Sequence, residues 1–212
     1  MFALPDALVD RVVSLRGDHR RIIAVVGAPG SGKSTLAEAL AEALSAQGIS
    51  AAVLPMDGFH YDDGLLAAMG LRPRKGAPET FDVAGFSHLL TRLRANDEDQ
   101  VCVPVFDRAL EISRNAARMI PSSVEILIVE GNYLLLDAPG WRELRKHYDV
   151  SVMLDVPETE LRARLWKRWQ DHGIPEAEIP AKVEGNDLRN ALTVLTQSLP
   201  ADLTIPQPSP TL

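Results

Sequence analysis

A glycine-rich stretch between residues 27 and 34 has the composition of a phosphate-binding loop. Its sequence, GAPGSGKS, matches the pattern G-x-x-x-x-G-K-[ST]. Glycines permit positive φ angles, which allow successive backbone N–H groups to converge on one anion. Lys33 can reach the terminal phosphates of ATP, and the Ser34 hydroxyl can ligate Mg²⁺. The predicted nucleotide cradle consists of Gly27, Ala28, Pro29, Gly30, Ser31, Gly32, Lys33, Ser34 and Thr35.

The segments on either side of this loop are those that phosphate binding needs. Residues 21–26 form a short apolar run that is typical of a central parallel strand buried on both faces. Residues 33–47 are rich in Ala, Leu and Glu, and Gly48 is a natural helix stop. The loop therefore joins a strand to a helix whose first N–H groups face the anion. A glycine-rich turn that binds nothing would not need this context.

Strands alternate with helices along the rest of the chain. We expect further strands at residues 50–55, 101–106, 124–129, 150–156 and 203–205. We expect helices at residues 4–15, 65–69, 82–94, 141–147 and 157–170. The rest of residues 57–78 should form loops, and residues 206–210 a frayed tail. This order predicts an α/β fold, a doubly wound parallel sheet with helices on both faces. No repeat or linker interrupts it, so we expect one domain over residues 1–212 with a core at about 20–205.

Composition limits the class of protein. The 212 residues are 46% hydrophobic and carry a formal net charge of −7, which disfavours binding to nucleic acid or to anionic membranes. The one cysteine, Cys102, lies in an apolar run, so we expect a buried thiol and no disulfide. The first residues do not resemble a signal peptide, and no apolar stretch approaches the roughly 20 residues of a membrane span. We therefore expect a cytoplasmic protein.

Several classes of protein contain such a loop. A GTPase needs an N-K-x-D stretch for guanine, and the sequence has none; residues 137–140 match D-x-x-G, but only by chance. A motor or remodelling ATPase stays open on pattern alone. A small-molecule kinase fits better, because acidic and basic residues cluster after predicted strands, where open α/β sheets bind ligands.

Three further stretches carry a family resemblance. Residues 56–61 (MDGFHY), 75–82 (KGAPETFD) and 129–133 (VEGNY) resemble the superfamily of uridine kinase, phosphoribulokinase and bacterial pantothenate kinase. The sequence is most similar to a bacterial subgroup of sugar kinases named fructose transport system kinases. The resemblance runs from about residue 21 to residue 190. It implies an ATP-dependent kinase with a P-loop fold and a small helical lid.

The resemblance implies roles for two carboxylates that follow predicted strands. Asp57 would be the general base, or would orient the accepting hydroxyl, which a carboxylate can do. Glu130 would lie near Mg²⁺ and the attacking oxygen. A carboxylate at the end of a central strand is costly to bury unless a cation or hydrogen bonds accompany it. A turn or cap is the alternative interpretation for each.

The same resemblance implies an acceptor pocket and a lid. Candidate pocket residues are His60, Tyr61, Glu79, Asp82 and Arg108, with Arg114 also within reach. Asp82 could instead cap the following helix, and the others could be ordinary surface residues. The lid would span residues 160–190, with Arg164 and Arg168 on one helical face, where they would stabilise the transferred phosphoryl group. A solvated basic face is the alternative, and the sequence assigns no role to Asn186 and Asn190.

The resulting hypothesis is transfer of the γ-phosphoryl group of MgATP to a hydroxyl of a small molecule. A sugar such as fructose is favoured as the acceptor, and a nucleoside or pantothenate is the alternative. A nucleotide-dependent switch or accessory protein of a sugar transporter is an alternative from another class. We expect no nucleic-acid partner and no membrane insertion, and a homodimer is compatible with the sequence.

Overall fold

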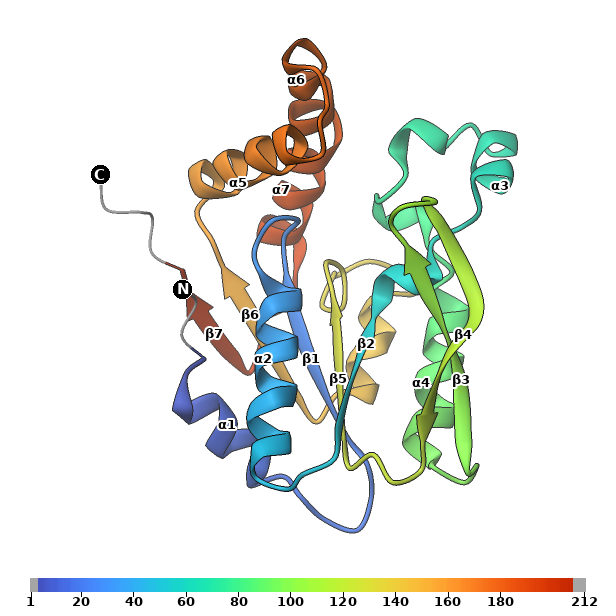
Figure 1. Ribbon diagram of the computed structural model, residues 1–212, viewed down its shortest axis with the longest axis vertical. Coiled ribbons are helices and arrows are strands. Elements are labelled where there is room, and N and C mark those ends of the chain that lie inside the picture. The colour runs from blue at the N-terminus through green and yellow to red at the C-terminus, as the bar shows by residue number, and fades with distance from the viewer. Residues whose placement is uncertain (1–3, 208–212) are drawn as a thin grey trace.

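Strand β1 (Arg21–Gly27) runs through the middle of a five-stranded sheet in the computed structural model, which describes residues 4–207 (Figure 1). Its neighbours are β5 (Ile126–Gly131) and β6 (Val150–Asp155), while β2 (Ala51–Pro55) and β7 (Leu203–Pro206) form the edges. Every pairing in this sheet is parallel. The carboxyl ends of the strands therefore meet at one edge, to which the phosphate loop belongs.

The side chains of β1 alternate between two hydrophobic cores. Ile22, Ala24 and Val26 pack into one cluster, and Ile23 and Val25 into the other. All five are completely buried, as expected for a central strand with helices on both faces. This burial holds the start of the phosphate loop in place.

Helices cover both faces of the sheet, as predicted (Figure 1). One face is covered by α1 (Asp6–Val13) and α2 (Lys33–Ala46). The other is covered by α4 (Val83–Ala95), the 3₁₀ turn η4 (Arg142–His147), α5 (Glu158–Asp171) and α7 (Leu188–Gln197). The predicted doubly wound α/β fold is confirmed. No helix among the described residues is long and apolar enough to cross a bilayer.

The strand predicted at residues 101–106 exists but lies outside the parallel sheet. As β3 (Gln100–Asp107) it pairs antiparallel with β4 (Ile112–Pro121), which the sequence did not predict. Most of β4 is exposed, so it lacks the apolar alternation that reveals a strand. The prediction of a buried thiol was also wrong, because Cys102 pairs with Met119 on the exposed side of this ribbon.

Short elements connect the sheet to the site. After β2 come the 3₁₀ turn η1 (Met56–Phe59), α3 (Asp63–Ala68) and the turns η2 (Arg72–Arg74) and η3 (Pro78–Thr80). After α5 come η5 (Glu176–Glu178), α6 (Ile179–Lys182) and a π-helical turn, η6 (Val183–Asp187). The sequence did not predict helix α7. The predicted tail at 206–210 falls mostly outside the described residues.

Candidate active site

The loop between β1 and α2 has the backbone of an anion cradle. Gly30 and Gly32 adopt φ angles of 81° and 89°, and Gly32 caps the amino terminus of α2. These left-handed conformations favour glycine. A Cβ on Gly27 would collide with the Ser31 side chain, so this position also needs glycine. The loop thus presents the first N–H groups of a 14-residue helix to a ligand at the carboxyl end of β1.

A cavity of about 410 Å³ opens beside this loop. It brings together five of the residues that were predicted to be catalytic or to bind the acceptor, namely Lys33, Asp57, His60, Arg108 and Arg168. Pro29 of the cradle also lines it, as do Arg72, Pro73, Lys75, Gly76, Phe81, Phe106, Glu111, Asn132, Trp169, Ala181, Lys182, Asn186, Asp187 and Asn190. In Figure 1 the loop between β1 and α2, helices α5 and α6, and the segment around α3 all lie beyond the upper ends of the strands.

Asp57 is held in the turn η1 immediately after β2. Its Oδ2 accepts a hydrogen bond of 2.7 Å from Nη2 of Arg108. The next residue, Gly58, lies so close to β3 that a Cβ would stand 2.7 Å from the carbonyl oxygen of Pro104. The hydroxyl of Ser113 in β4 also donates a hydrogen bond to the Gly58 carbonyl. The β3–β4 ribbon therefore fixes the turn that carries the candidate base.

His60 lies three residues further on, and its ring packs close to two aromatic rings. The ring centroids of Phe81 and Phe106 are 4.0 Å and 4.7 Å away. Nδ1 lies 2.8 Å from the carbonyl oxygen of Asp57. Burial lowers the pKa of His60, although the Asp57 carboxylate opposes this effect. The imidazole is therefore neutral at pH 7.

Glu130 ends β5 with a carboxylate that is 5% exposed. Its Oε2 is buried and has no hydrogen-bond partner among the described residues. Burial raises the pKa of Glu130, while Lys33 and a hydrogen bond from Ser34 lower it. A hydroxyl and a buried, incompletely satisfied carboxylate are ligand types that suit Mg²⁺. Within residues 4–207, no cluster of three His, Cys, Asp or Glu side chains is placed to hold a metal.

The two predicted lid arginines have different surroundings. Arg164 pairs with Glu160 at 2.6 Å, and its Nη1 donates to the carbonyl oxygen of Ser31 at 3.3 Å. Helix α5 thereby contacts the back of the phosphate loop. Arg168 lines the cavity, beside the ring of Trp169. Of the two, Arg168 is the one that lines the cavity.

Other predicted pocket residues do not line the cavity. Asp82 caps α4 by accepting a hydrogen bond of 2.9 Å from the backbone N–H of Gly85, which is the alternative that the sequence left open. Glu79 is exposed near Arg74. Tyr61 is half-buried, and Arg114 pairs with Asp107 at 3.3 Å. Of the predicted pocket residues, His60 and Arg108 therefore line the cavity, and Tyr61, Glu79, Asp82 and Arg114 do not.

Several cavity residues were given no role from the sequence. Asn186 and Asn190 accept hydrogen bonds from Arg74 at 2.6 Å and 3.2 Å, which ties the lid to the segment after α3. Lys75 and Arg72 share the carboxylate of Asp63. Trp169 donates its indole N–H to Asp187 at 2.7 Å. Lys75 lay inside a recognised motif, but only the tertiary structure brings these groups to one cavity.

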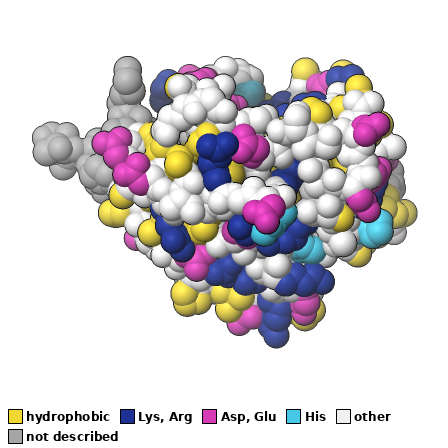
Figure 2. All heavy atoms as spheres, turned by 90° about the horizontal axis from the view of Figure 1, so that it is seen from below, with side chains coloured by type: hydrophobic (Ala, Val, Ile, Leu, Met, Phe, Trp, Pro, Cys, Tyr) yellow, Lys and Arg dark blue, Asp and Glu magenta, His cyan; other side chains and the backbone are white. Residues whose placement is uncertain are grey.

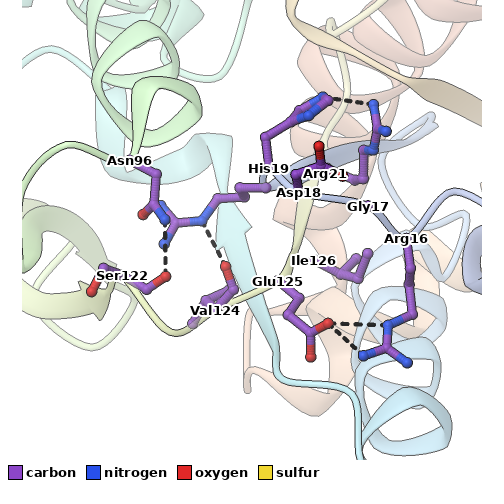
Figure 3. Close-up of a pocket in the computed structure, with 11 residues that line it drawn as sticks. Arg16, Gly17, Asp18, His19, Arg21, Asn96, Ser122, Val124, Glu125 and Ile126 are labelled. Carbon is purple, nitrogen blue, oxygen red and sulfur yellow. Dashed lines mark hydrogen bonds and ion pairs between the residues drawn. The ribbon is translucent and has the colours of Figure 1, made fainter.

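A smaller hollow of about 150 Å³ lies at the opposite end of the sheet (Figure 3). Figure 2 views the molecule from that end and shows Lys and Arg side chains gathered there among acidic ones. The arginines of the hollow already have partners. Arg20 donates to the carbonyl oxygens of Val124, Leu93 and Pro121, and Arg16 pairs with Glu125 at 2.6 Å. These contacts close the loop before β1, so the hollow is a structural feature and the candidate site is the larger cavity.

Comparison with family models gives one match. A model described as "AAA domain" matches residues 23–184. This range begins in β1, contains the phosphate loop and ends in the π-helical turn. The match therefore covers the phosphate loop and most of the segment 160–190 that was predicted to form a lid.

Relatives that cover much of the chain carry kinase names. The Schizosaccharomyces pombe protein "Putative uridine kinase C227.14" is 34% identical over 95% of this chain and 90% of its own. A crystal structure of a "putative fructose transport system kinase" from Silicibacter sp. TM1040 is 49% identical, with a TM-score of 0.91 over 97% of this chain and 100% of its own. Pantothenate kinase from Listeria innocua is 32% identical over 66% of this chain, which spans 47% of that enzyme.

Proposed function

Because the chain belongs to the superfamily of P-loop kinases that includes uridine kinase, phosphoribulokinase and pantothenate kinase, we propose that it transfers the γ-phosphoryl group of MgATP to a hydroxyl of a sugar or sugar-like metabolite. The observation that carries this proposal is the single cavity shared by Lys33, Asp57 and Arg168. Phosphoryl transfer needs a cation that binds the phosphates, a base that accepts the proton of the hydroxyl, and further positive charge near the transferred group. Lys33, Asp57 and Arg168 are residues of these three types.

The nucleotide would bind with its phosphates on the backbone of residues 27–35. Lys33 would contact the β- and γ-phosphates, and Arg168 would approach from the lid. Both cations would neutralise charge on the equatorial oxygens of the transferred group. Arg164, which holds the Ser31 carbonyl, would position the loop rather than contact the phosphoryl group.

The acceptor would lie between Asp57 and the aromatic wall around His60. Asp57 would orient the hydroxyl and take its proton as the oxygen forms a bond to the γ-phosphorus. The bond from that phosphorus to the β–γ bridging oxygen breaks, and ADP leaves. For Asp57 to do so, the acceptor must approach a carboxylate that already accepts a hydrogen bond from Arg108.

The residues around Glu130 fit a magnesium ion. Ser34 and the buried Glu130 carboxylate would hold it, directly or through water. A magnesium ion held there would supply positive charge that offsets the negative charge of the nucleotide phosphates. The unpartnered Oε2 of Glu130 is the feature of this chain that supports such a site.

ADP release from MgATP tests the proposal. Wild-type protein is assayed with a panel of sugars, nucleosides and pantothenate, with Lys33→Ala as the inactive variant. Lys167→Ala is the matched control, because Lys167 is exposed on α5 and pairs with the exposed Asp171 on the same helix. We expect one acceptor to raise the wild-type and Lys167→Ala rates well above their acceptor-free rates, and to leave Lys33→Ala unchanged.

Other results would point elsewhere. If the protein phosphorylates uridine or pantothenate faster than every sugar, the proposed acceptor is a nucleoside or pantothenate and not a sugar. These two compounds appear in the names of the relatives from S. pombe and Listeria innocua. ATP binding with no acceptor-stimulated ADP release would contradict the kinase proposal and favour a nucleotide-dependent switch. Location in the cytoplasm and formation of a homodimer stay predictions, the second of which light scattering of the purified protein would test.

A further inference from the structure

The indole of Trp169 contacts three charged side chains at the edge of the cavity. Its Nε1–H donates a hydrogen bond of 2.7 Å to Oδ2 of Asp187. The ammonium nitrogen of Lys182 lies 4.8 Å from the centroid of the indole ring, and the guanidinium carbon of Arg168 lies 5.8 Å from it. Both cations are within the roughly 6 Å at which the face of an indole attracts positive charge. All four residues line the cavity.

These four residues come from three elements of the lid. Arg168 and Trp169 belong to α5, Lys182 is the last residue of α6, and Asp187 is the last residue of η6. The hydrogen bond from Trp169 to Asp187 joins residues that are 18 positions apart. Trp169 also packs against the hydrophobic core. Its ring is therefore a fixed support at the point where these lid elements meet.

Arg168 and Lys182 differ from the other basic residues around them, because neither has a carboxylate partner. Within the described residues 4–207, the side chains of both form no ion pair and no hydrogen bond. The remaining basic residues of α5 all form ion pairs with acidic side chains, namely Arg162, Arg164 and Lys167. The two cations beside the indole therefore keep their positive charge available for an anionic ligand.

The carboxylate of Asp187 does not cancel this charge. Burial raises the pKa of Asp187, whereas the hydrogen bond from Trp169 and the charges of Arg168 and Lys182 lower it. When Asp187 is ionised, two cations and one carboxylate leave one positive charge in excess. When Asp187 is protonated, both positive charges remain. The group attracts an anion in either state.

Helix α5 carries this charge to the phosphate loop. Nη1 of Arg164 donates to the carbonyl oxygen of Ser31 in the loop at 3.3 Å. Arg168 follows Arg164 by four residues, so it lies on the same face of α5 and about 6 Å further along the helix. Lys33 of the loop lines the same cavity as Arg168. A terminal phosphate bound by Lys33 would therefore face the lid cations.

We propose that Trp169 is a positioning residue, whose indole holds Arg168 and Lys182 toward the terminal phosphate of the bound nucleotide. Lys182 is then a second lid cation that contacts this phosphate, a role that the sequence did not assign to it. Asp187 fixes the indole by accepting its N–H. The inference rests on the proposed function only in taking ATP as the ligand of the phosphate loop.

Nucleotide affinity tests the inference without any acceptor. Calorimetry on the full chain compares MgADP with the magnesium complex of a non-hydrolysable ATP analogue. The variants are Lys182→Ala, Trp169→Leu and Trp169→Phe. The matched controls on α5 are Lys167→Ala, at an exposed position, and Trp166→Leu, at a residue that packs against the core and does not line the cavity.

Lys182→Ala and Trp169→Leu should each raise the Kd of the ATP analogue about threefold to thirtyfold, because a cation–π contact or the cation itself is lost. The Kd of ADP, which lacks the terminal phosphate, should change less than twofold. Trp169→Phe keeps an aromatic face and should recover part of the loss. Both controls should stay within twofold for either nucleotide. Equal losses for the two nucleotides in Lys182→Ala, or no loss for the analogue, would overturn the inference.

A background without the two cations separates positioning from packing. When Trp169→Leu is added to the double variant Arg168→Ala/Lys182→Ala, the Kd of the analogue should change less than twofold, because no cation remains for the indole to hold. A further loss as large as the one in wild type would show that Trp169 acts through packing alone, and would refute its positioning role.

The result is distinguishable from failure of the kinase proposal. The expected affinities without acceptor-stimulated ADP release would contradict only the kinase proposal. Acceptor-stimulated ADP release together with equal affinities of wild type and Lys182→Ala for the ATP analogue would contradict only this inference. Absence of binding of both nucleotides to the wild-type protein would contradict both.

Discussion

Arg108 donates a hydrogen bond from Nη2 to Oδ2 of Asp57 at 2.7 Å, although 51 residues separate them in the chain. The arginine side chain is 57% exposed and the aspartate 20%. An ion pair this open to solvent contributes at most about 1 kcal/mol to stability. The ion pair instead helps to position Asp57, because it joins the turn after β2 to the tip of the β3–β4 ribbon.

Asp57→Asn should lower kcat by at least about a hundredfold, because the amide cannot take the proton of the acceptor. Affinity for MgATP should change less than twofold, and the free energy of unfolding by less than about 0.5 kcal/mol. Steady-state ADP release, nucleotide titration and urea unfolding measure the three quantities. Asp62→Asn is the control, since asparagine caps α3 as well as aspartate does. Turnover at the wild-type rate in Asp57→Asn would remove Asp57 from the mechanism.

The contact between Arg74 and Asn186 should be energetically coupled. Arg74 donates to Oδ1 of Asn186 at 2.6 Å, and Nδ2 of Asn186 donates to the carbonyl oxygen of Lys75 at 3.0 Å. A double-mutant cycle with Arg74→Ala and Asn186→Ala should give about 1–2 kcal/mol of interaction in urea unfolding. Arg189→Ala, at an exposed position in α7, is the control for loss of an arginine side chain. Additive effects of Arg74→Ala and Asn186→Ala would show that the two segments are not coupled.

Asp187 should make stability depend on pH. Burial raises the pKa of Asp187 above its usual 3.8, although the hydrogen bond from Trp169 opposes this. As pH rises, Asp187 loses its proton in the unfolded chain at a lower pH than in the folded chain. The free energy of unfolding therefore falls as pH rises from about 3.8 through the higher pKa of the folded state. Asp187→Asn keeps an acceptor for Trp169 and should gain stability over wild type between pH 4 and pH 7.

Urea unfolding at several pH values measures this gain, with Asp171→Asn as the control for removal of an exposed carboxylate. A gain that is the same at pH 4 and pH 7 would show that the Asp187 charge is not the cause. Activity should fall in the same variant if the charge of Asp187 orders the π-helical turn around a ligand.

Gly58→Ala should destabilise the protein by about 1–3 kcal/mol, because its Cβ would stand 2.7 Å from the carbonyl oxygen of Pro104. The turn that carries Asp57 would have to move away from β3, so kcat should fall as well. Gly185→Ala is the matched control, since a Cβ there meets no atom within 4 Å. That change should be neutral or stabilise the helix by up to about 1 kcal/mol. Equal stability of the two variants in urea would mean that β3 does not fix the turn.

The sequence pattern alone predicted the secondary structure around the phosphate loop. The apolar run 21–26, the glycines after it and the helix from Lys33 predicted the strand, cradle and helix that the structure contains, because each depends mainly on its own residues. The buried strand predicted at 124–129 also exists, as β5 at Ile126–Gly131. The exposed strand β4 was not, because its residues face water and carry no alternation.

Which residues line the cavity depended on the tertiary structure. Arg108 and Asp57 meet because the β3–β4 ribbon forms a separate sheet that packs against η1. The hydrophobic periodicity of neither segment predicts this packing. The same holds for Asn186 and Arg74, which are 112 residues apart. By itself the sequence determined the phosphate loop, the alternation of strands and helices, and the chemical types of the candidate residues. Only the folded chain decided which of them share one cavity and which, like Asp82, cap a helix, because those contacts join segments that are distant in sequence.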